Sequence, residues 1–379
     1  MIINGFLGIR NTSPVRSIPD RALSAAFDVD IDNAGLDEIG ANNGGIILQR
    51  NGFAHSVVLS NVTSAYSTLD QAGYVVAGGV LYQFRSDLSY VAIASCSATN
   101  FTDYGKNLFT NDGLHIVDGV AFNIKIPSPA QPPDIALTSG SLPAGAYSAC
   151  YTYRSLVSGI EGGSSPLQTV ELTDAAHSFT LSSAAPPSGY EIRYYVTDAG
   201  GAVYYDVDGV QLQQSQILAN PFPDDVEQIA WHDSRLWVSK TLPSGGSCVW
   251  FSDPFLYHSY DFVENYLLFP GQVLGMASTP SGLIIGTDAA LYLCDENSAQ
   301  PLANYGVIAG RPITRLPDGS ARIHTKRGEC AAMPFQNLTE NKCSLAPGVS
   351  CSTAMVEQNG IRKFMVLTDG SGVPYNASF

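Results

Sequence analysis

The chain has 379 residues, including 36 Gly, 22 Pro and 19 Tyr, and only 14% of its residues are charged. Period-two alternation of apolar residues is common and helical periodicity is rare, which favours an all-β protein with many tight turns. The net charge of −15 comes from 19 Lys+Arg against 34 Asp+Glu. So few cations argue against a basic, phosphate-binding face.

One local phrase recurs along the chain: an apolar run, a short polar turn ending in Gly, and a second apolar run. Its glycines are Gly35, Gly73, Gly113, Gly282, Gly319 and Gly360, and another copy has its turn at Asp233 and Ser234. Spacings between successive glycines are 38, 40, 37 and 41, leaving out the interval from Gly113 to Gly282. Repeats of roughly 40 residues built from short strands are typical of β-propeller blades. We therefore predict a seven-bladed β-propeller, with six blades as the alternative if a terminal unit is degraded.

The first repeat contains three alternating carboxylates, Asp28, Asp30 and Asp32, which suggest a calcium loop. An EF-hand loop needs Gly at its sixth position and Glu at its twelfth, but this segment has Asn33 and Ile39 there. The pattern favours a strand with one solvated face over a metal site.

The periodicity is interrupted once, because Gly113 and Ser234 are 121 residues apart. Subtracting one repeat of about 40 residues leaves about 80, the size of a small sandwich domain. Proline-rich segments at 125–134 and 220–225 border this stretch, and Tyr147, Ala149, Tyr151 and Tyr153 alternate within it. We predict a fibronectin- or immunoglobulin-like β-sandwich at 131–221, inserted between propeller segments 1–130 and 222–379. Two irregular blades are the alternative.

Several residue types that often carry chemistry have simpler interpretations here. Trp231, Trp237 and Trp250 are predicted to wedge their repeat against the next, with ligand stacking or catalysis as the alternative. The six histidines lack metal-binding spacing and are expected on the surface or in turns. No catalytic or nucleotide-binding motif is present, so we predict no catalytic, cofactor-binding or metal-binding residue and a chain that is not an enzyme.

The seven cysteines include no CxxC pair. Cys150 and Cys294 lie in apolar strand patterns and are expected to be buried thiols, whereas Cys343 and Cys351 are candidates for a disulfide. The N-terminal sequence lacks the pattern of a signal peptide, and no apolar stretch is long enough to span a bilayer. We expect a soluble product of a reducing cytoplasm.

Three segments resemble bacteriophage virion β-propeller proteins of the tail hub or nozzle (tail accessory) type. Segment 8–39 is similar to the opening phrase of that group, segment 248–295 is similar to a later blade, and segment 336–346 also fits a late blade. The matching positions of the opening phrase are Asn11, Pro14, Leu23, Ala26, Asp28, Val29, Asp30, Ile31, Asp32 and Gly35.

The resemblance implies a structural virion protein, made in the host cytoplasm, without cofactor or membrane insertion. It implies a homo-oligomeric ring, with a hexamer favoured, that contacts other tail or connector proteins and fibres. DNA would pass through an acidic bore during ejection as non-specific cargo. The alternative is a carbohydrate-binding or glycan-hydrolysing propeller with an accessory sandwich. We also predict that a strand within residues 2–9 closes the propeller by pairing near residues 364–367, because unpaired edge strands invite aggregation.

Overall fold

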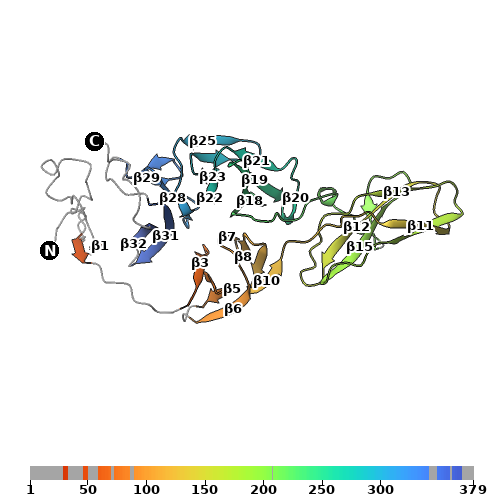
Figure 1. Cartoon of the computed structure of the whole chain (residues 1–379), viewed down its shortest axis with the longest axis horizontal. Helices are drawn as coiled ribbons and strands as arrows, with labels where there is room; N and C mark the ends of the chain where they lie inside the picture. The colour runs from red at the N-terminus through yellow and green to blue at the C-terminus, as the bar shows by residue number, and fades with distance from the viewer. Residues whose placement is uncertain are drawn as a thin grey trace. The chain divides into compact units, whose positions relative to one another are not determined.

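The computed structural model describes residues 29–32, 46–49, 59–69, 72–85, 89–206, 208–340, 348–358 and 361–368. In these ranges the regular elements are β-strands and one short 3-10 helix, η2 (Gln214–Gln216), with no α-helix. Figure 1 labels the strands from β1 in red to β32 in blue. The predicted all-β class is confirmed.

The strands before residue 131 form three antiparallel sheets. The first has two strands and the others have four, paired in sequence order. They are β1 (Val29–Asp32) and β2 (Ile46–Gln49); β3 (Val62–Ser67), β4 (Gly73–Ala77), β5 (Val80–Phe84) and β6 (Tyr90–Ser95); and β7 (Phe101–Tyr104), β8 (Asn107–Thr110), β9 (Leu114–Val117) and β10 (Val120–Asn123).

The strands after residue 221 form four further sheets. The first is β17 (Gln228–His232), β18 (Arg235–Thr241), β19 (Ser247–Asp253) and β20 (Leu256–Tyr260), with β21 (Tyr266–Phe269) also paired to β19. The next is β22 (Val273–Thr279), β23 (Gly282–Thr287), β24 (Leu291–Cys294) and β25 (Ala299–Ala303). The last two are β27 (Ile313–Arg315), β28 (Ala321–Thr325), β29 (Gly328–Ala331) and β30 (Gln336–Asn337), and then β26 (Ala309–Arg311), β31 (Ser350–Gln358) and β32 (Ile361–Thr368).

The repeated turns fall at hairpins wherever the structure describes them. Gly113 (φ 92°), Gly319 (φ 82°) and the pair Asp233 (φ 47°) and Ser234 (φ 63°) adopt the left-handed conformation that tight hairpins need. Gly73 and Gly282 instead begin the second strands of their sheets. Gly35 and Gly360 lie outside the described residues. Gly113 lies between the second and third strands of its sheet, whereas Ser234 and Gly319 lie between the first and second.

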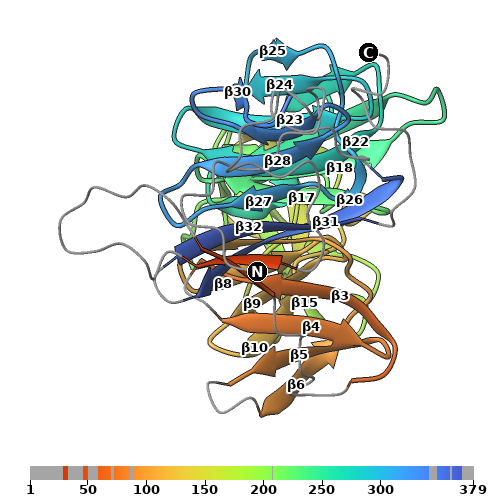
Figure 2. The ribbon, with the colours of Figure 1, turned by 90° about the vertical axis from the view of Figure 1, so that its left-hand side faces the viewer.

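The chain divides into two compact units. One comprises Met1–Leu59, Leu274–Cys294 and Ala299–Phe379, and the other, which we call the central unit, comprises Ser60–Val273 and Asp295–Ser298. In the first unit, sheets β22–β25 and β27–β30 share a core that includes Ile284, Val307 and Ile323, each 0% exposed. Figure 2 labels strands of these sheets in cyan and blue.

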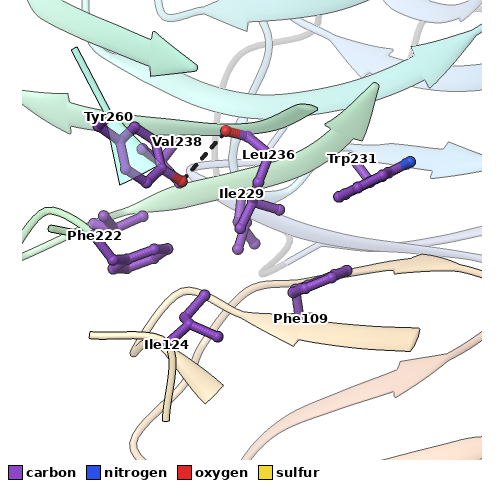
Figure 3. Packing of buried hydrophobic residues seen from close by; sticks show 9 residues of the cluster. Phe109, Ile124, Phe222, Ile229, Trp231, Leu236, Val238 and Tyr260 are labelled. Carbon is purple, nitrogen blue, oxygen red and sulfur yellow. Dashed lines mark hydrogen bonds between the residues drawn. The ribbon is translucent and has the colours of Figure 1, made fainter. Parts of the chain in front are cut away.

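The central unit has two cores between successive sheets. One joins β3–β6 to β7–β10 through residues such as Val76, Leu81 and Leu108. The other joins β7–β10 to β17–β20 and is shown in Figure 3. There the Tyr260 hydroxyl donates a hydrogen bond to the Leu236 carbonyl (3.3 Å). Burying such apolar surface is the main favourable term that holds sheet to sheet.

Residues 131–221 form two antiparallel sheets of their own. Strand β11 (Asp134–Ser139) pairs with β14 (His177–Ser182). The other sheet has the order β13 (Gln168–Leu172), β12 (Gly145–Ser155), β15 (Tyr190–Thr197) and β16 (Tyr204–Tyr205). We call this part the insert, after the sequence-based prediction that residues 131–221 are an inserted domain.

The predicted alternation along β12 holds in part. Tyr147, Ala149, Tyr151 and Tyr153 are all buried, as one shared apolar face requires. Cys150 and Thr152, on the opposite face, are also buried, and Cys150 belongs to a second core with Tyr195, Tyr204 and Leu212. The second half of β12 is therefore covered on both faces.

The sheet that contains β31 and β32 has a partner strand that the sequence did not predict. Strand β26 pairs with β31 in parallel, joining Ala309–Arg311 to Ser350–Ser352. Gly310 has φ 97°, and a Cβ there would lie 2.3 Å from the Cys351 carbonyl oxygen. Residues 2–9, predicted to pair near 364–367, lie outside the described residues.

Candidate interaction site

A stack of rings joins sheet β7–β10 to sheet β17–β21. Trp231 stacks on Tyr104, with centroids 5.1 Å apart, and on Phe109, at 5.4 Å and an interplanar angle of 4°. Phe109 in turn stacks on His115 at 4.5 Å. The Trp231 backbone N–H donates to Thr102 Oγ1 (2.9 Å). Trp231 is therefore a wedge between two sheets, but it packs against the sheet that precedes its own, whereas the prediction placed it against the next one.

The other two tryptophans pack against rings of their own repeat. Trp237 is 0% exposed, and its ring centroid lies 4.4 Å from that of Phe251. Its Nε1–H donates a hydrogen bond to the His232 carbonyl (3.2 Å). Trp250 is partly buried against Phe262 at 5.3 Å. Only the outer end of the Trp231 stack is open, because Tyr104 is 55% exposed.

The insert is joined to the sheets of the central unit by three chain segments. Ser128, on the incoming segment, donates from Oγ to the Ala219 carbonyl (3.1 Å) on the outgoing segment. Asn220 and Tyr260 then exchange two backbone hydrogen bonds, of 2.8 and 3.0 Å. The third segment is the loop after β12, and Ile160 of this loop packs against the core of β17–β20.

Two glycines allow these segments to cross closely. A Cβ at Gly163 would lie 2.1 Å from the Ala219 carbonyl oxygen, and one at Gly162 would lie 2.8 Å from Ile126 Cγ2. Real Cβ atoms do not approach backbone atoms at 2.1 Å. The crossing therefore requires Gly at position 163.

The charged side chains buried in the insert bind one another. Glu161 accepts hydrogen bonds from Tyr195 (2.6 Å) and Thr152. Arg193 Nη2 lies 2.8 Å from Asp206 Oδ2, and the Asp206 side chain is only 3% exposed. Arg193 Nη1 lies 3.8 Å from Glu161 Oε2. This cluster is an internal ion network, since its carboxylates and its guanidinium are engaged with each other.

The prediction that the histidines lie on the surface or in turns is wrong for three of them. His115, His258 and His324 are buried. Burial lowers the pKa of His115 and of His258 to about 4. His324 Nδ1 lies 2.5 Å from Glu329 Oε1. His177 is half-exposed beside Asp174, and His55 lies outside the described residues. Strand positions explain the difference, since inward-facing sites accept an imidazole that is stacked or paired.

The described cysteines are buried, as expected for Cys150 and Cys294. Burial raises the pKa of Cys96, Cys150 and Cys248 to about 12, which keeps these thiols protonated at neutral pH. Cys351 is also buried, while its predicted disulfide partner Cys343 lies outside the described residues.

The acidic residues are unevenly distributed between the two units. The central unit contains 7 Lys+Arg and 22 Asp+Glu, so it carries a net charge of −15, and the other unit contains 12 of each and is neutral. Within the neutral unit, residues 299–379 have 8 Lys+Arg against 5 Asp+Glu. The whole net charge of the chain therefore belongs to the central unit.

Most of this acidity does not lie on the strands that open the sheets. In β3, β7, β17, β22 and β27 the one carboxylate is Asp103, which is buried and accepts a hydrogen bond from Tyr66. Highly exposed carboxylates lie in turns instead, such as Asp118, Asp208, Asp224 and Asp225, with side chains 70 to 84% exposed. Asp30 and Asp32 lie in strand β1, as predicted, and Asp28 lies outside the described residues.

No group of three or more His, Cys, Asp or Glu that could hold a metal ion occurs among the described residues. The same part of the chain has no helix with the length and apolar character needed to cross a membrane. The prediction that the chain has no metal, cofactor or catalytic site remains a prediction.

The outer strand of sheet β17–β21 presents apolar side chains to solvent. Strand β21 pairs with β19 through Ser247–Trp250, and among the described strands it has no partner on its other side. Tyr266 and Leu268 share one face of β21 and are 39% and 61% exposed, and Val263 just before it is 79% exposed. The acidic residues Asp261 and Glu264 lie in the same segment. We call residues 261–268 the β21 edge.

Comparison with known proteins gave no family. No family model matches the chain, and no curated protein matches it. Among solved structures, BBS1N in complex with ARL6DN has 14% identity and a TM-score of 0.33, covering 79% of this chain and 85% of that one. PorZ, a surface component of the type-IX secretion system of Porphyromonas gingivalis, has 11% identity and a TM-score of 0.28, with 83% and 45% covered. A puromycin hydrolase mutant complexed with PGG has 11% identity and a TM-score of 0.32, with 83% and 52% covered. These scores are too low to carry an argument about function.

Proposed function

We propose that this chain is a homo-oligomeric structural component of a bacteriophage tail, of the hub or nozzle type. In this proposal its sheets are the blades of a β-propeller with six to seven blades, and residues 131–221 are an inserted fibronectin- or immunoglobulin-like β-sandwich. Its partners are further copies of itself in a ring, other tail or connector proteins, and fibres.

The architecture of the described sheets is the observation that carries this proposal. Small antiparallel sheets follow one another along the chain, each paired mostly in sequence order, and successive sheets share apolar cores. A small sheet of this kind is not stable alone and needs neighbours on its faces, as in a propeller. Sheets β7–β10 and β17–β21 pack directly through Trp231, so the repeat continues across the insert.

Two further observations support a sandwich and a structural role. Tyr147 of one insert sheet contacts Phe179 of the other edge-to-face, with centroids 5.4 Å apart. The ionic groups Glu161, Arg193 and Asp206 are bound to one another within residues 131–221, so their charges are neutralised inside the protein. The resemblance of segments 8–39 and 248–295 gives the proposal its bacteriophage setting.

The proposal that DNA passes through the assembly depends on the charge of the chain. A basic lining would bind the polyanion and stall it, so an acidic or neutral passage is required. In β3, β7, β17, β22 and β27 the one carboxylate is Asp103, which is buried, so these strands contribute no exposed carboxylate. The exposed carboxylates Asp118, Asp224 and Asp225 each lie 3.1 to 3.6 Å from a lysine, so the expected repulsion rests on the net charge of −15 and not on these three groups.

A carbohydrate-binding propeller is the second candidate, and Tyr104 favours it. Its ring is half-exposed and is held by Trp231, which makes a rigid aromatic platform of the kind on which a sugar ring packs. Glycan binding by the purified chain that is lost in Tyr104→Ala and retained in Leu137→Ala would favour this candidate.

Quantitative mass spectrometry of purified virus particles that encode the chain tests the leading proposal. Several copies per particle are expected. One copy per particle, or none, would contradict the ring.

A further inference from the structure

We propose that residues 257–259 of strand β20 form an acid-sensitive contact, in which protonation of His258 releases the insert segments that pack on this strand. We call these three residues the β20 bulge, and we call the contacts of strand β20 with the insert segments the joint. The inference goes beyond the proposed function, because it concerns how residues 131–221 are held and applies to a monomer and an oligomer alike.

Strand pairing leaves the β20 bulge outside the regular ladder. Ser252 pairs with Tyr260, but the next residue, Asp253, pairs with Leu256, so three residues of β20 are left out of the pairing with β19. Bulges bend a strand and re-aim its side chains. The His258 imidazole is buried, and neither of its nitrogens has a hydrogen-bond partner among the described residues. A buried polar ring in this state is costly, so the position is sensitive to an added charge.

The outgoing segment of the insert is bonded to the bulge and to the residue after it. Ser259 Oγ donates a hydrogen bond to the Ser215 carbonyl (3.5 Å). Tyr260 and Asn220 exchange two backbone hydrogen bonds, of 2.8 and 3.0 Å. The strand that carries His258 is therefore the strand on which the outgoing segment docks.

The loop after β12 meets the same histidine. The backbone carbonyl of Glu161 lies beside the His258 imidazole, and it already accepts a hydrogen bond from Gln216 Nε2 (3.1 Å). The Ser164 N–H donates to the Gln216 backbone carbonyl (2.8 Å), which ties this loop to the outgoing segment. A movement at His258 therefore acts on both segments together.

The carboxylates around the β20 bulge do not balance a charge on His258. Burial lowers the pKa of His258, and the group that opposes this shift is the Glu161 backbone carbonyl, not a carboxylate. Ionisable groups on the surrounding elements include Glu161, Arg193 and Tyr195 of the insert, Asp253, Arg235 and Tyr257 of sheet β17–β21, and His115 of sheet β7–β10. Glu161 accepts hydrogen bonds from Tyr195 and Thr152, and Asp253 accepts one from Ser259. A protonated His258 is therefore a buried charge without a counterion, and exposing the ring to water relieves that cost.

The size of the effect follows from the two pKa values of the ring. The pKa of His258 is about 4 in the closed joint, and a released imidazole titrates at its ordinary 6.5. The stability of the closed joint is therefore fully present above pH 6.5 and is lost as the pH falls toward 4. From about pH 7 to about pH 5 the equilibrium constant for opening should rise about 20-fold.

Hydrogen exchange of the full-length chain, measured by mass spectrometry, tests the joint. The reporters are the backbone amides of Asn220 and Tyr260, which are bonded to each other's carbonyls across it. After correction for the intrinsic exchange rate, we expect their protection to fall about 20-fold from about pH 7 to about pH 5. Strands β4 and β5 lie in the same unit away from the joint, and their amides should keep their protection.

Neutral replacements of the histidine identify the titrating group. His258→Gln cannot be protonated over this range, and we expect it to remove the pH dependence at the joint; His258→Phe should do the same. His115→Gln is the matched control, because His115 is 6% exposed against 7% for His258 and also has a pKa of about 4. Its Nε2 is bonded to Asn107 of its own sheet, so this variant should keep the 20-fold change. Asp253→Asn should keep it too, and circular dichroism checks that the variants fold.

Three outcomes would overturn the inference. The first is an unaltered chain whose joint keeps the same protection at both pH values. The second is an equal loss of protection in His258→Gln and in the unaltered chain. The third is a loss at the joint that is matched in β4 and β5, since that describes unfolding of the whole unit. None of these outcomes bears on whether the chain forms a ring, so the proposed function is tested separately.

Discussion

Replacing Trp231 by Ala should loosen the contact between sheets β7–β10 and β17–β21. The indole is 8% exposed and stacks on both Tyr104 and Phe109. Removal of a buried Trp costs about 3 to 5 kcal/mol in free energy of unfolding. Each stacked pair accounts for about 0.5 to 1.5 kcal/mol of that loss. The backbone bond to Thr102 does not involve the side chain, so the loss measures the ring.

Urea unfolding followed by circular dichroism measures this cost. Tyr104→Ala is the graded control, since it removes one stacked pair from a half-exposed position and should cost about 0.5 to 1.5 kcal/mol. Trp250→Ala removes a partly buried indole of the same sheet that packs against the shared core but does not stack on a ring of β7–β10, and should cost less than Trp231→Ala. If Trp231→Ala costs no more than Tyr104→Ala, the wedge between sheets is not a stabilising contact.

Three further predictions concern the segment crossing at Gly163, the buried His258 and the buried cysteines. Gly163→Ala should destabilise the chain by about 1 to 3 kcal/mol, because the new Cβ meets the Ala219 carbonyl, whereas Gly73→Ala, whose new Cβ would lie at an ordinary 3.6 Å from Phe84 Cβ, should cost less. His258 has a folded pKa of about 4 against an ordinary 6.5, so its neutral form contributes stability above pH 6.5 that is lost as the pH falls toward 4. His258→Phe should therefore flatten the decline of Tm over that interval, and an unchanged slope would argue against the burial. Cys150 and Cys248 should resist iodoacetamide in the folded chain and react in urea, as peptide mass mapping would record, and rapid labelling of the folded chain would contradict their burial.

The sequence predicted the all-β class and the hairpin turns more successfully than it predicted where each hairpin lies within its sheet. Apolar alternation and turn residues are local signals, so the hairpins at Gly113, Ser234 and Gly319 could be placed directly. Their position within each sheet depends on strand pairing. Gly113 therefore falls one hairpin later than its counterparts, and Gly73 belongs to a strand rather than a turn.

Contacts between distant segments could not be predicted. The parallel pairing of β26 with β31 joins residues about 40 positions apart and leaves no local pattern, apart from Gly310. The network of Glu161, Arg193 and Asp206 likewise depends on three separate segments. A buried histidine such as His115 cannot be told from an exposed one by sequence, because a single polar residue in a strand does not show which face of the sheet packs against a neighbouring sheet.

The crossing at Gly163 has a mechanical consequence for the insert. A domain attached by two flexible linkers can swing, and it can be removed or exchanged without harm to its host. Here the loop after β12 is pressed into the host sheets through Ile160, and the incoming and outgoing segments are bonded to each other. Deleting residues 131–221 would remove packing from the core of β17–β20 as well as the insert. A force applied to residues 131–221 would be transmitted to sheet β17–β20 through these packed segments, and not only through two flexible linkers.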